Sequence, residues 1–592
     1  MDKIEETNKI QEPNKLQENN TQSEIQDKFK LPIFYNDKKM ELNTHIINDL
    51  ELTKCVNDKE KPIFNYIFQP TTCFGEAIIP NFSKYYTTDI TFLKNTQKMI
   101  KSYKKTIHTK ENKQFSAYEF QTIYNAWNEL KGETSFCEKY LFIDWDAFKF
   151  LNTNSSFLQA MSIYNITSPI ISLFMPIVIL IIPFFILKFK GLDVTVNQYL
   201  DILKVIISNH AICKMFTDFN NVDTAQRLYL VFSSALYVFS IYQNILTCIR
   251  FYSNMKKIHD YLNKFHSYIE YTIYKIEQYT SITNTLSCYT SFNEELQTNK
   301  DILCRFNDKI KHMLSFSVTF MKIMQIGDIL HSFYDLYNDI ELHNAFTYSF
   351  GFHGYLDNLH GLMQNIDKKR MNKGTIVNSE NKNKFYKQYY PTFLLDKHVK
   401  NNCDLTTNMI ITGPNASGKT TLLKTTIINT ILTQQFGYGC YTKATITPHK
   451  YIHCYLNIPD TSGRDSLFQA EARRCKEIID CINMFKKDRH FCVFDELYSG
   501  TNPEEATESA IAFMEYITKY SNVSCILTTH YIDLCKHLET NKSITNYNMK
   551  TIATKDTLEY TYILNKGISE IKGGCQVLVD MQYPQEILDK IK

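Results

Sequence analysis

The strongest constraint on the fold of this chain is a glycine-rich segment that directly follows a short apolar run. Residues 408–413, NMIITG, have the composition of a buried strand, and residues 413–420, GPNASGKT, match the pattern GxxxxGK[ST]. A helical pattern follows the motif. A strand, a glycine-rich loop and a helix in this order are typical of an α/β sheet that binds phosphate, because backbone N–H groups of the loop surround the phosphate oxygens. The sequence therefore predicts a phosphate-binding α/β domain.

The same loop predicts which groups contact a nucleotide and its metal ion. Lys419 supplies a positive charge near the β- and γ-phosphate oxygens, and the hydroxyl of Thr420 is a ligand for Mg²⁺. The predicted fold is an α/β P-loop NTPase domain over residues 389–592, with ATP and Mg²⁺ as cofactors. The predicted nucleotide-binding residues are Gly413, Pro414, Asn415, Ala416, Ser417, Gly418, Lys419, Thr420 and Thr421.

Two adjacent carboxylates follow a second predicted strand. Residues 491–494, FCVF, are apolar and lead into Asp495 and Glu496. Such a pair is more often a surface turn when it occurs alone, but downstream of a phosphate-binding loop it fits a metal ligand and a catalytic base. We therefore expect Asp495 to bind Mg²⁺ together with Thr420, and Glu496 to polarise the attacking water.

A histidine follows the third predicted strand. The apolar residues 523–527 precede Thr528, Thr529 and His530. Because ligands of open α/β sheets bind at the carboxyl ends of the strands, His530 is predicted to sense the γ-phosphate. The alternative is that His530 caps the helix that follows it. Together the three segments predict Mg²⁺-dependent ATP hydrolysis.

An uncharged stretch in the first half of the chain is long enough to cross a membrane. Residues 169–187, PIISLFMPIVILIIPFFIL, are nineteen positions without a charge, close to the roughly 20 that a helix needs to span the hydrocarbon core. A second uncharged stretch covers residues 228–249. We therefore predict a transmembrane helical hairpin within residues 166–250. The alternative is a pair of buried core helices, and it has more weight for the second stretch, which is more amphipathic.

A hairpin would return the chain to its starting side, so both ends would face the compartment that contains ATP. The positive charges around the hairpin do not determine the orientation. We therefore expect a membrane protein whose ATPase domain faces the cytosol, or a viral or organellar equivalent. A nuclear location is the alternative if the hairpin does not span a membrane.

The other segments are interpreted from composition and periodicity. Residues 1–30 are too polar to form a core and are expected to be a disordered tail. Residues 31–165 and 251–388 are expected to be mostly helical, with a polar linker from about residue 367 to 388. An apolar series from Met255 to Ile276, spaced mainly by three and four residues, predicts one long packed helix.

Composition excludes several classes of function. The chain has Lys+Arg 65 and Asp+Glu 62, so it is not held to nucleic acid by overall charge, although local patches remain compatible with this balance. None of the 16 cysteines forms a CxxC pair, and no Cys/His group has zinc-finger spacing. Reduced thiols in a cytosolic chain are therefore expected.

The motifs together resemble the ATPase domain of the MutS family of DNA mismatch-repair proteins. TGPNASGKTTLLK is similar to that family's TGPN-x-x-GKST loop, DELYSGTNPEEA to its DEL-x-x-GT segment, and LTTHY to its ATHY. Residues 458–471, IPDTSGRDSLFQAE, resemble the signature D-x-x-SG-x-STF-x-x-E, with one additional residue before Ser466. Residues 69–97 resemble the start of the family's helical core. The resemblance implies an ABC/MutS-like fold at the carboxyl terminus, preceded by a helical core and lever region.

The resemblance also implies partners and a further catalytic residue. In the family, two subunits form composite ATP sites, and the serine aligned with Ser466 reaches the γ-phosphate bound by the partner subunit. We therefore expect a homodimer in which Ser466 acts in trans, with a helix cap in cis as the alternative. DNA is implied as a ligand in the same way.

The chain also departs from the repair members of the family. Phe74 and Glu76 fit the F-x-E motif of the segment that inserts beside a mismatch, but they lie in the core-like stretch, so we interpret the match as coincidence. The apolar hairpin resembles that of MutS-like proteins with predicted membrane helices. Two functions stay open: a DNA-binding, ATP-hydrolysing clamp of the mismatch-repair type, and a membrane-tethered ATP switch that recognises no mismatch. A transporter of the related ABC kind is disfavoured, because one hairpin supplies too few helices.

Overall fold

The computed structural model divides into two compact units. It describes residues 20–571 except 58, 110–114, 192–194, 210–222, 315–318, 379–382, 395–397, 457, 459–465 and 554–557, and also 578–579, 581–588 and 590. Unit 1 comprises Met1–Gln121, Tyr274–Asn299 and Thr347–Lys592, and unit 2 comprises Thr122–Ile273 and Lys300–Phe346. These boundaries do not coincide with the domain boundaries expected at residues 165 and 388. The glycine-rich loop lies in unit 1 and the apolar hairpin in unit 2.

Unit 1 contains a six-stranded sheet with the order β13-β12-β6-β11-β10-β9. The strands from β9 to β12 run parallel, and β13 pairs antiparallel with β12 at one edge. Almost every residue of β6, β10 and β11 is buried, as in sheets covered on both faces, and these are the three strands expected from the sequence. The strands are β6 (Asn408–Thr412), β9 (Tyr451–Tyr455), β10 (His490–Asp495), β11 (Val523–Thr528), β12 (Ile544–Ala553) and β13 (Leu558–Lys566).

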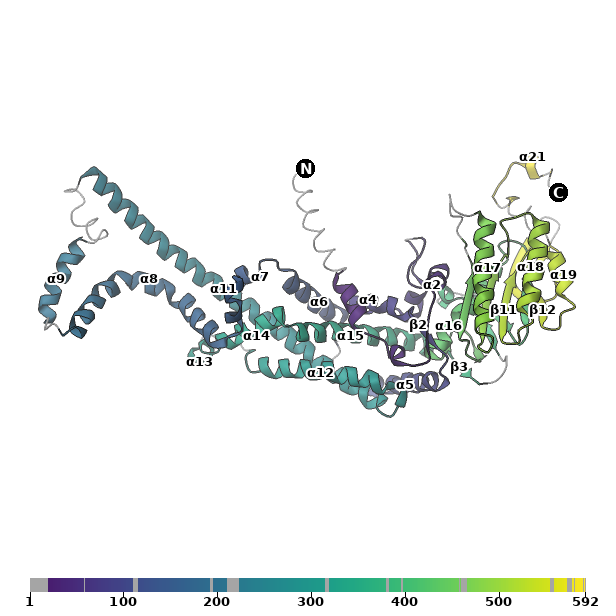
Figure 1. Cartoon of the computed structure of the whole chain (residues 1–592), viewed down its shortest axis with the longest axis horizontal. Coiled ribbons are helices and arrows are strands. Elements are labelled where there is room, and N and C mark those ends of the chain that lie inside the picture. Colours follow the sequence, from purple (N-terminus) through teal and green to yellow (C-terminus); the bar gives the residue numbers. More distant parts are fainter. Residues whose placement is uncertain are drawn as a thin grey trace. The chain divides into compact units, whose positions relative to one another are not determined.

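Helices connect the parallel strands (Figure 1). The helix that follows the glycine-rich loop packs on β10 and β11, and the other three share a buried core with the sheet that includes Ile482, Phe494 and Met514. These helices are α16 (Lys419–Phe436), α17 (Leu467–Met484), α18 (Pro503–Ile517) and α19 (Ile532–Leu538), and a short α21 (Gln585–Leu588) lies near the end of the chain. The strand, loop and helix order predicted from the motif is therefore present.

A second sheet corrects the interpretation of residues 367–388 as a solvated linker. Its order is β5-β4-β8-β3-β7, and Gly374 of β3 and Phe385 of β4 both lie opposite Ala444 of β8. Ile376 and Phe385 are buried in it. The partner strand β8 lies more than 50 residues further along the chain, so the polar composition of the segment did not reveal this pairing. The elements are β3 (Asn372–Ile376), β4 (Lys384–Gln388), η4 (Pro391–Leu394), β5 (Asn401–Asp404), β7 (Tyr438–Gly439) and β8 (Lys443–Ile446).

The amino-terminal elements of unit 1 pack closely on the helix α15 (Ile340–Asp367). A Cβ atom at Gly361 would lie 1.6 Å from the carbonyl oxygen of Phe68, and one at Gly354 would lie 2.2 Å from that of Phe74. Only glycine permits this approach. Phe74 is fully buried, which agrees with a place in the core. The elements are η1 (Pro32–Tyr35), β1 (Lys39–Glu41), α2 (Thr44–Asp49), α3 (Ile63–Phe68), α4 (Cys73–Phe82), β2 (Tyr85–Thr87) and α5 (Ile90–Thr109).

The expectation of a disordered tail over residues 1–30 is corrected for its last part. Residues 20–28 are helical, and the side chains of Ile25 and Phe29 are fully buried. The amide of Asn81 donates hydrogen bonds to the carbonyl oxygens of Gln26 (3.1 Å) and Phe29 (3.0 Å). These two apolar side chains, four positions apart, lie on one helical face, which the composition of a polar tail does not show. Residues 1–19 lie outside the described part.

Buried glutamine side chains join the end of α16 to these amino-terminal elements. Gln435 donates to the carbonyl oxygens of Phe82 (2.6 Å) and Tyr85 (2.9 Å). Gln97 of α5 donates to the carbonyl oxygen of Gly437 (2.7 Å), directly after α16. The helix that begins at the glycine-rich loop therefore ends in hydrogen bonds with the helical segment of the same unit.

Unit 2 is helical. Its long helix α11 carries the predicted apolar series, and Met255, Ile258, Leu262 and Phe265 are at most 4% exposed, which confirms the predicted packed helix. The helices are α6 (Ala117–Gly132), α7 (Phe136–Tyr140), η2 (Asp146–Thr153), α8 (Ser155–Phe189), α9 (Val196–Asn209), α11 (Thr224–Thr283), α12 (Thr290–Ile310), α13 (Phe320–Ile323) and α14 (Ile326–Asn338), and η3 (Ser287–Tyr289) precedes α12. Parts of α6, α11 and α12, and all of η3, belong to unit 1.

Two helices of unit 2, α8 and α11, are long and apolar enough to cross a membrane. The hydroxyl of Tyr237 on α11 donates to the carbonyl oxygens of Ser172 (3.1 Å) and Leu173 (3.0 Å) on α8, so the helices contact each other. Only 22% and 11% of their most apolar windows are buried, and Leu228, for example, is 70% exposed. The described side chains of these two helices are therefore mostly exposed, and insertion into a membrane stays a prediction. Figure 1 shows α8, α9 and the first half of α11 extending beyond the other helices of the unit.

Candidate functional site

The loop between β6 and α16 encloses the amine of Lys419. Gly413 (φ 152°), Ala416 (φ 62°) and Gly418 (φ 92°) have backbone conformations that glycine adopts most readily. The Lys419 side chain is buried, and its Nζ donates to the carbonyl oxygens of Gly413 (3.0 Å) and Pro414 (3.3 Å). A buried cation beside the amino terminus of a helix favours an anion at this position.

A carboxylate and two hydroxyls meet beside the loop. Thr420, in the first turn of α16, donates from its Oγ1 to the Oδ2 of Asp495 at 2.9 Å. The hydroxyl of Thr528, at the end of β11, donates to the other carboxylate oxygen of Asp495. Carboxylate and hydroxyl oxygens are the ligands that Mg²⁺ prefers. The predicted metal ligands Thr420 and Asp495 are therefore together, and their donor atoms suit this ion.

Glu496, His530 and Lys419 also lie together at the carboxyl ends of the strands. The Nε2 atom of His530 lies 2.7 Å from the Oε1 of Glu496 and 3.2 Å from the Nζ of Lys419. The hydrogen bond from His530 lowers the pKa of Glu496, which favours its carboxylate form. Burial lowers the pKa of Lys419, and the carboxylates of Glu496 and Asp495 oppose that shift. The cap residue of α19 is Tyr531, so His530 faces the loop instead of capping the helix.

A cavity of about 530 Å³ opens along the glycine-rich loop. Its volume lies within the range of about 300–1,000 Å³ that small-molecule sites occupy. The rings of Tyr389 and His398, which also line the cavity, are stacked with centroids 4.1 Å apart. The cavity is lined by Asn415, Ala416, Ser417, Gly418, Lys419, Thr420, Thr421, Leu422, Thr425, Gln388, Tyr389, Tyr390, His398, Val399, Asn401, Glu496, Met549 and Tyr562.

Ser466 lies apart from this group as the exposed cap residue of α17. Its Oγ accepts a hydrogen bond from the backbone N–H of Gln469 (3.3 Å), and the side chain of Gln469 accepts one from the backbone N–H of Ser466 (3.0 Å). The helix cap, one of the two expected roles, is therefore observed. A role in trans stays a prediction. Ser462 and Gly463 of the same motif lie outside the described residues.

Two residues that lie within the recognised motifs, but to which the motif analysis assigned no role, support the site. Thr528 holds one carboxylate oxygen of Asp495, as described above. Glu471 is buried and accepts hydrogen bonds from the hydroxyl of Ser499 (2.9 Å) and the N–H of Gly500 (3.1 Å), which ties α17 to the segment after Glu496. Glu471 lies in the same motif as Ser466, and Thr528 lies in the same motif as His530. These positions in the motifs were the only indication in the sequence that the two residues support the site.

The comparisons with known proteins agree with this arrangement. Residues 409–592 match the family described as MutS domain V. The DNA mismatch repair protein MutS of Acholeplasma laidlawii is 27% identical over 184 residues, which cover 31% of this chain and 21% of that protein. The DNA mismatch repair protein Msh3 of Homo sapiens is 27% identical over 217 residues, covering 33% and 19%. Endonuclease MutS2 of Lactobacillus gasseri is 27% identical over 232 residues, covering 38% and 28%.

These matches define the carboxyl-terminal part as an α/β domain of the MutS domain V type, preceded by helical regions. Residues 409–592 therefore relate this chain to the MutS family through that part of its length. The matched part spans between 19% and 28% of the length of these three curated relatives.

Proposed function

We propose that the chain is an Mg²⁺-dependent ATPase of the P-loop class. The observation that carries the proposal is the convergence of Lys419, Thr420, Asp495, Glu496 and His530 at the carboxyl ends of β6, β10 and β11, beside the cavity of about 530 Å³. A buried cation, a hydroxyl with a carboxylate and a second carboxylate at a glycine-rich loop are the groups that phosphoryl transfer to water requires.

Each residue has a distinct role in the proposed reaction. The loop N–H groups and the Lys419 amine bind the phosphates, and Thr420 and Asp495 hold Mg²⁺, which neutralises phosphate charge when bound. The carboxylate of Glu496 orients the attacking water and accepts its proton. The water oxygen bonds to the γ-phosphorus, the bond to the bridging oxygen breaks, and ADP and phosphate form. His530 donates to Glu496 and faces the γ-phosphate position.

We further propose that two copies of the chain form composite sites, with Ser466 acting on the nucleotide of the partner subunit. The support is the resemblance of residues 458–471 to the family signature and the exposed position of Ser466 at the start of α17. The site of one chain contains Lys419, Glu496 and His530. A serine from the partner subunit would add a hydroxyl donor to the γ-phosphate beside these three residues.

Mixing two inactive variants tests the composite site. Lys419→Ala and Ser466→Ala proteins are each expected to be inactive, because every site of either homodimer lacks one group. After subunit exchange, activity should return to about a quarter of that of the parent, since half of randomly assembled dimers are mixed and each has one intact site of its two. Phosphate release measures the recovery.

The control for this experiment separates the hydroxyl from the cap. Ser466→Asn keeps a residue that caps helices well but removes the hydroxyl. If Ser466→Asn is as active as the parent, or if mixing restores nothing after exchange of labelled subunits has been measured, Ser466 is a helix cap only.

We also propose that the protein binds DNA, because two of its relatives are DNA mismatch repair proteins. The detergent-solubilised full-length protein should bind a duplex with one mismatch more tightly than a perfect duplex. Titration of both duplexes at two salt concentrations measures this. Equal affinities that both fall steeply with salt would mean phosphate contacts without recognition of a mismatch, and would contradict a repair-type function.

A membrane-tethered ATP switch is the second candidate function, and the exposure of α8 and α11 is the observation that favours it. Their apolar side chains, such as Leu173, Leu228 and Val238, are more than half exposed, whereas soluble proteins rarely expose contiguous apolar surface of this extent. A bilayer would cover these side chains. We propose that the ATPase domain then faces the cytosol or a viral or organellar equivalent.

Alkaline extraction tests the membrane proposal. An integral protein stays in the membrane pellet, and a protein held by peripheral contacts is released to the supernatant. We expect the parent chain in the pellet, and we expect Leu173→Lys combined with Val238→Lys to move it to the supernatant. A charge at the middle of a span, as at Val238, costs about 2.5–3.5 kcal/mol, and the charge at Leu173, nearer the end of its span, adds to this cost. Release of the parent chain would contradict membrane insertion.

A further inference from the structure

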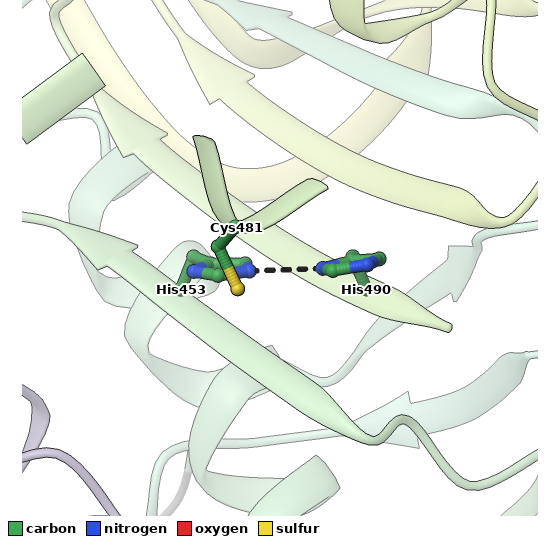
Figure 2. A group of neighbouring side chains, drawn as sticks. All are labelled: His453, Cys481 and His490. Atoms are coloured by element: carbon green, nitrogen blue, oxygen red, sulfur yellow. Dashed lines mark hydrogen bonds between the residues drawn. The ribbon is translucent and has the colours of Figure 1, made fainter. Parts of the chain in front are cut away.

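A second group of reactive side chains lies in the six-stranded sheet, away from the nucleotide site. His453 on β9, Cys481 in the last turn of α17 and His490 at the start of β10 come together (Figure 2). His490 is five residues before Asp495 on the same strand, a separation of roughly 16 Å at the rise of a β-strand. The group is therefore separate from the proposed nucleotide site at the glycine-rich loop.

The three donor atoms are close enough for one metal ion. The Nε2 of His453 lies 3.1 Å from the Nδ1 of His490. One ring nitrogen of each histidine and the sulfur of Cys481 lie within 4.8 Å of one another. Two imidazole nitrogens on a tetrahedral zinc ion lie about 3.4 Å apart, and a nitrogen and a thiolate sulfur about 3.6 Å. The nitrogen separation is thus near the required value, and the sulfur needs to approach by about 1 Å at most.

The hydrogen bonds around His490 direct a lone pair toward the group. Its Nε2 lies 3.1 Å from the carbonyl oxygen of Phe485, which only accepts hydrogen bonds, so this nitrogen carries the proton. The Nδ1 of His490 is then an acceptor and faces His453. A backbone carbonyl that fixes the tautomer of a histidine is the usual outer partner of a metal ligand. The ring of Tyr451 also stacks on His490, with centroids 5.0 Å apart, and fixes its orientation.

Without a metal, one hydrogen bond connects the two imidazole rings. The rings of His453 and His490 are nearly coplanar, at 9°, with centroids 5.4 Å apart, so the Nε2–H of His453 donates to the Nδ1 of His490. Burial lowers the pKa of His453 to about 3 and also lowers that of His490, so both rings are neutral, as metal ligands must be. On metal binding, the proton of His453 moves to its other ring nitrogen, the thiol proton is released to solvent, and the rings tilt toward Cys481.

We propose that His453, Cys481 and His490 bind one zinc ion, with water as the fourth ligand. Two imidazoles and a thiolate suit zinc, whereas Mg²⁺ and Ca²⁺ prefer oxygen ligands, so this site and the nucleotide site select different ions. A cavity of about 340 Å³ borders both His453 and Cys481 and provides the position for the water. The edge strand, the end of α17 and the start of β10 would be held together by the ion.

Metal analysis tests the zinc site on the full-length protein. The protein is treated with a chelator, loaded with Zn²⁺ in the presence of excess Mg²⁺, and freed of unbound ions by gel filtration. The parent protein should retain one more zinc ion per chain than either variant, Cys481→Ser or His453→Gln. Each substitution should weaken Zn²⁺ binding at least about 100-fold, because changes to outer partners alone cost about 10- to 100-fold. Cys55→Ser is the control, since Cys55 is another half-buried free cysteine outside the group.

Alkylation of the parent protein provides a measurement that needs no variant. Zn²⁺ should protect Cys481 from a maleimide, as mapped by peptide mass spectrometry, and should leave the labelling of Cys55 unchanged. If the parent retains no additional zinc, if Cys481→Ser retains as much as the parent, or if Zn²⁺ does not protect Cys481, the group is a hydrogen-bonded histidine pair beside a thiol. None of these readouts depends on ATP hydrolysis.

Discussion

Replacing Glu496 by Gln is expected to abolish turnover while ATP still binds. Glutamine has nearly the shape of glutamate and keeps an oxygen that accepts from His530, but it has no carboxylate to take the proton of the attacking water. The rate of hydrolysis should fall by about 10²- to 10⁴-fold, the contribution of a positioned general base. Single-turnover hydrolysis of ATP by the purified protein, together with the amount of ATP bound, measures both effects.

A matched control uses a glutamate outside the site. Glu539 lies exposed directly after α19, and Glu539→Gln should hydrolyse ATP like the parent. If Glu496→Gln also keeps the parent rate, Glu496 is not the base, and the assignment of the catalytic water to this carboxylate is wrong.

Replacing Lys419 by Ala is expected to weaken nucleotide binding itself. The buried amine now donates to loop carbonyl oxygens and is positioned to donate to phosphate oxygens instead. Loss of hydrogen bonds from a charged donor costs roughly 1.5–3 kcal/mol, which is about 10- to 150-fold in affinity. Equilibrium titration with a fluorescent ATP analogue measures the change.

Two further variants separate charge from packing. Lys419→Met keeps an unbranched apolar side chain in the buried position and should lose as much affinity as Lys419→Ala. Lys443 is exposed at the start of β8, and Lys443→Ala should bind ATP like the parent. Parent-like affinity of Lys419→Ala would show that this loop does not hold the phosphates.

The arrangement of the candidate nucleotide site could be predicted because its signals are local in the sequence. The loop, β6 and the start of α16 are consecutive, and the carboxylates and His530 directly follow the apolar runs of β10 and β11. Parallel strands bring their carboxyl ends to one edge, so a prediction of three buried strands also predicted which side chains meet. The capping role of Ser466 could be stated as an alternative for the same reason, since serine is a favoured residue directly before the start of a helix.

The features that sequence reasoning missed depend on contacts between distant segments. The strands β3 and β4 consist largely of polar residues, and β8, far along the chain, pairs with both. Ile25 and Phe29 are buried by other helices of unit 1 rather than by their neighbours in a polar tail. His453, Cys481 and His490 come from two strands and a helix, with spacings of 28 and 9 residues that match no metal motif.

Release of phosphate from ATP by the purified full-length protein, measured with Mg²⁺ and again after its removal with EDTA, tests the proposed activity most directly. The arrangement of Lys419, Thr420 and Asp495 predicts steady hydrolysis with Mg²⁺ and a loss of that activity with EDTA, restored when Mg²⁺ is added back. No phosphate release with Mg²⁺ from protein shown to be folded, or release that EDTA does not affect, would contradict the account of this site as an Mg²⁺-dependent ATPase.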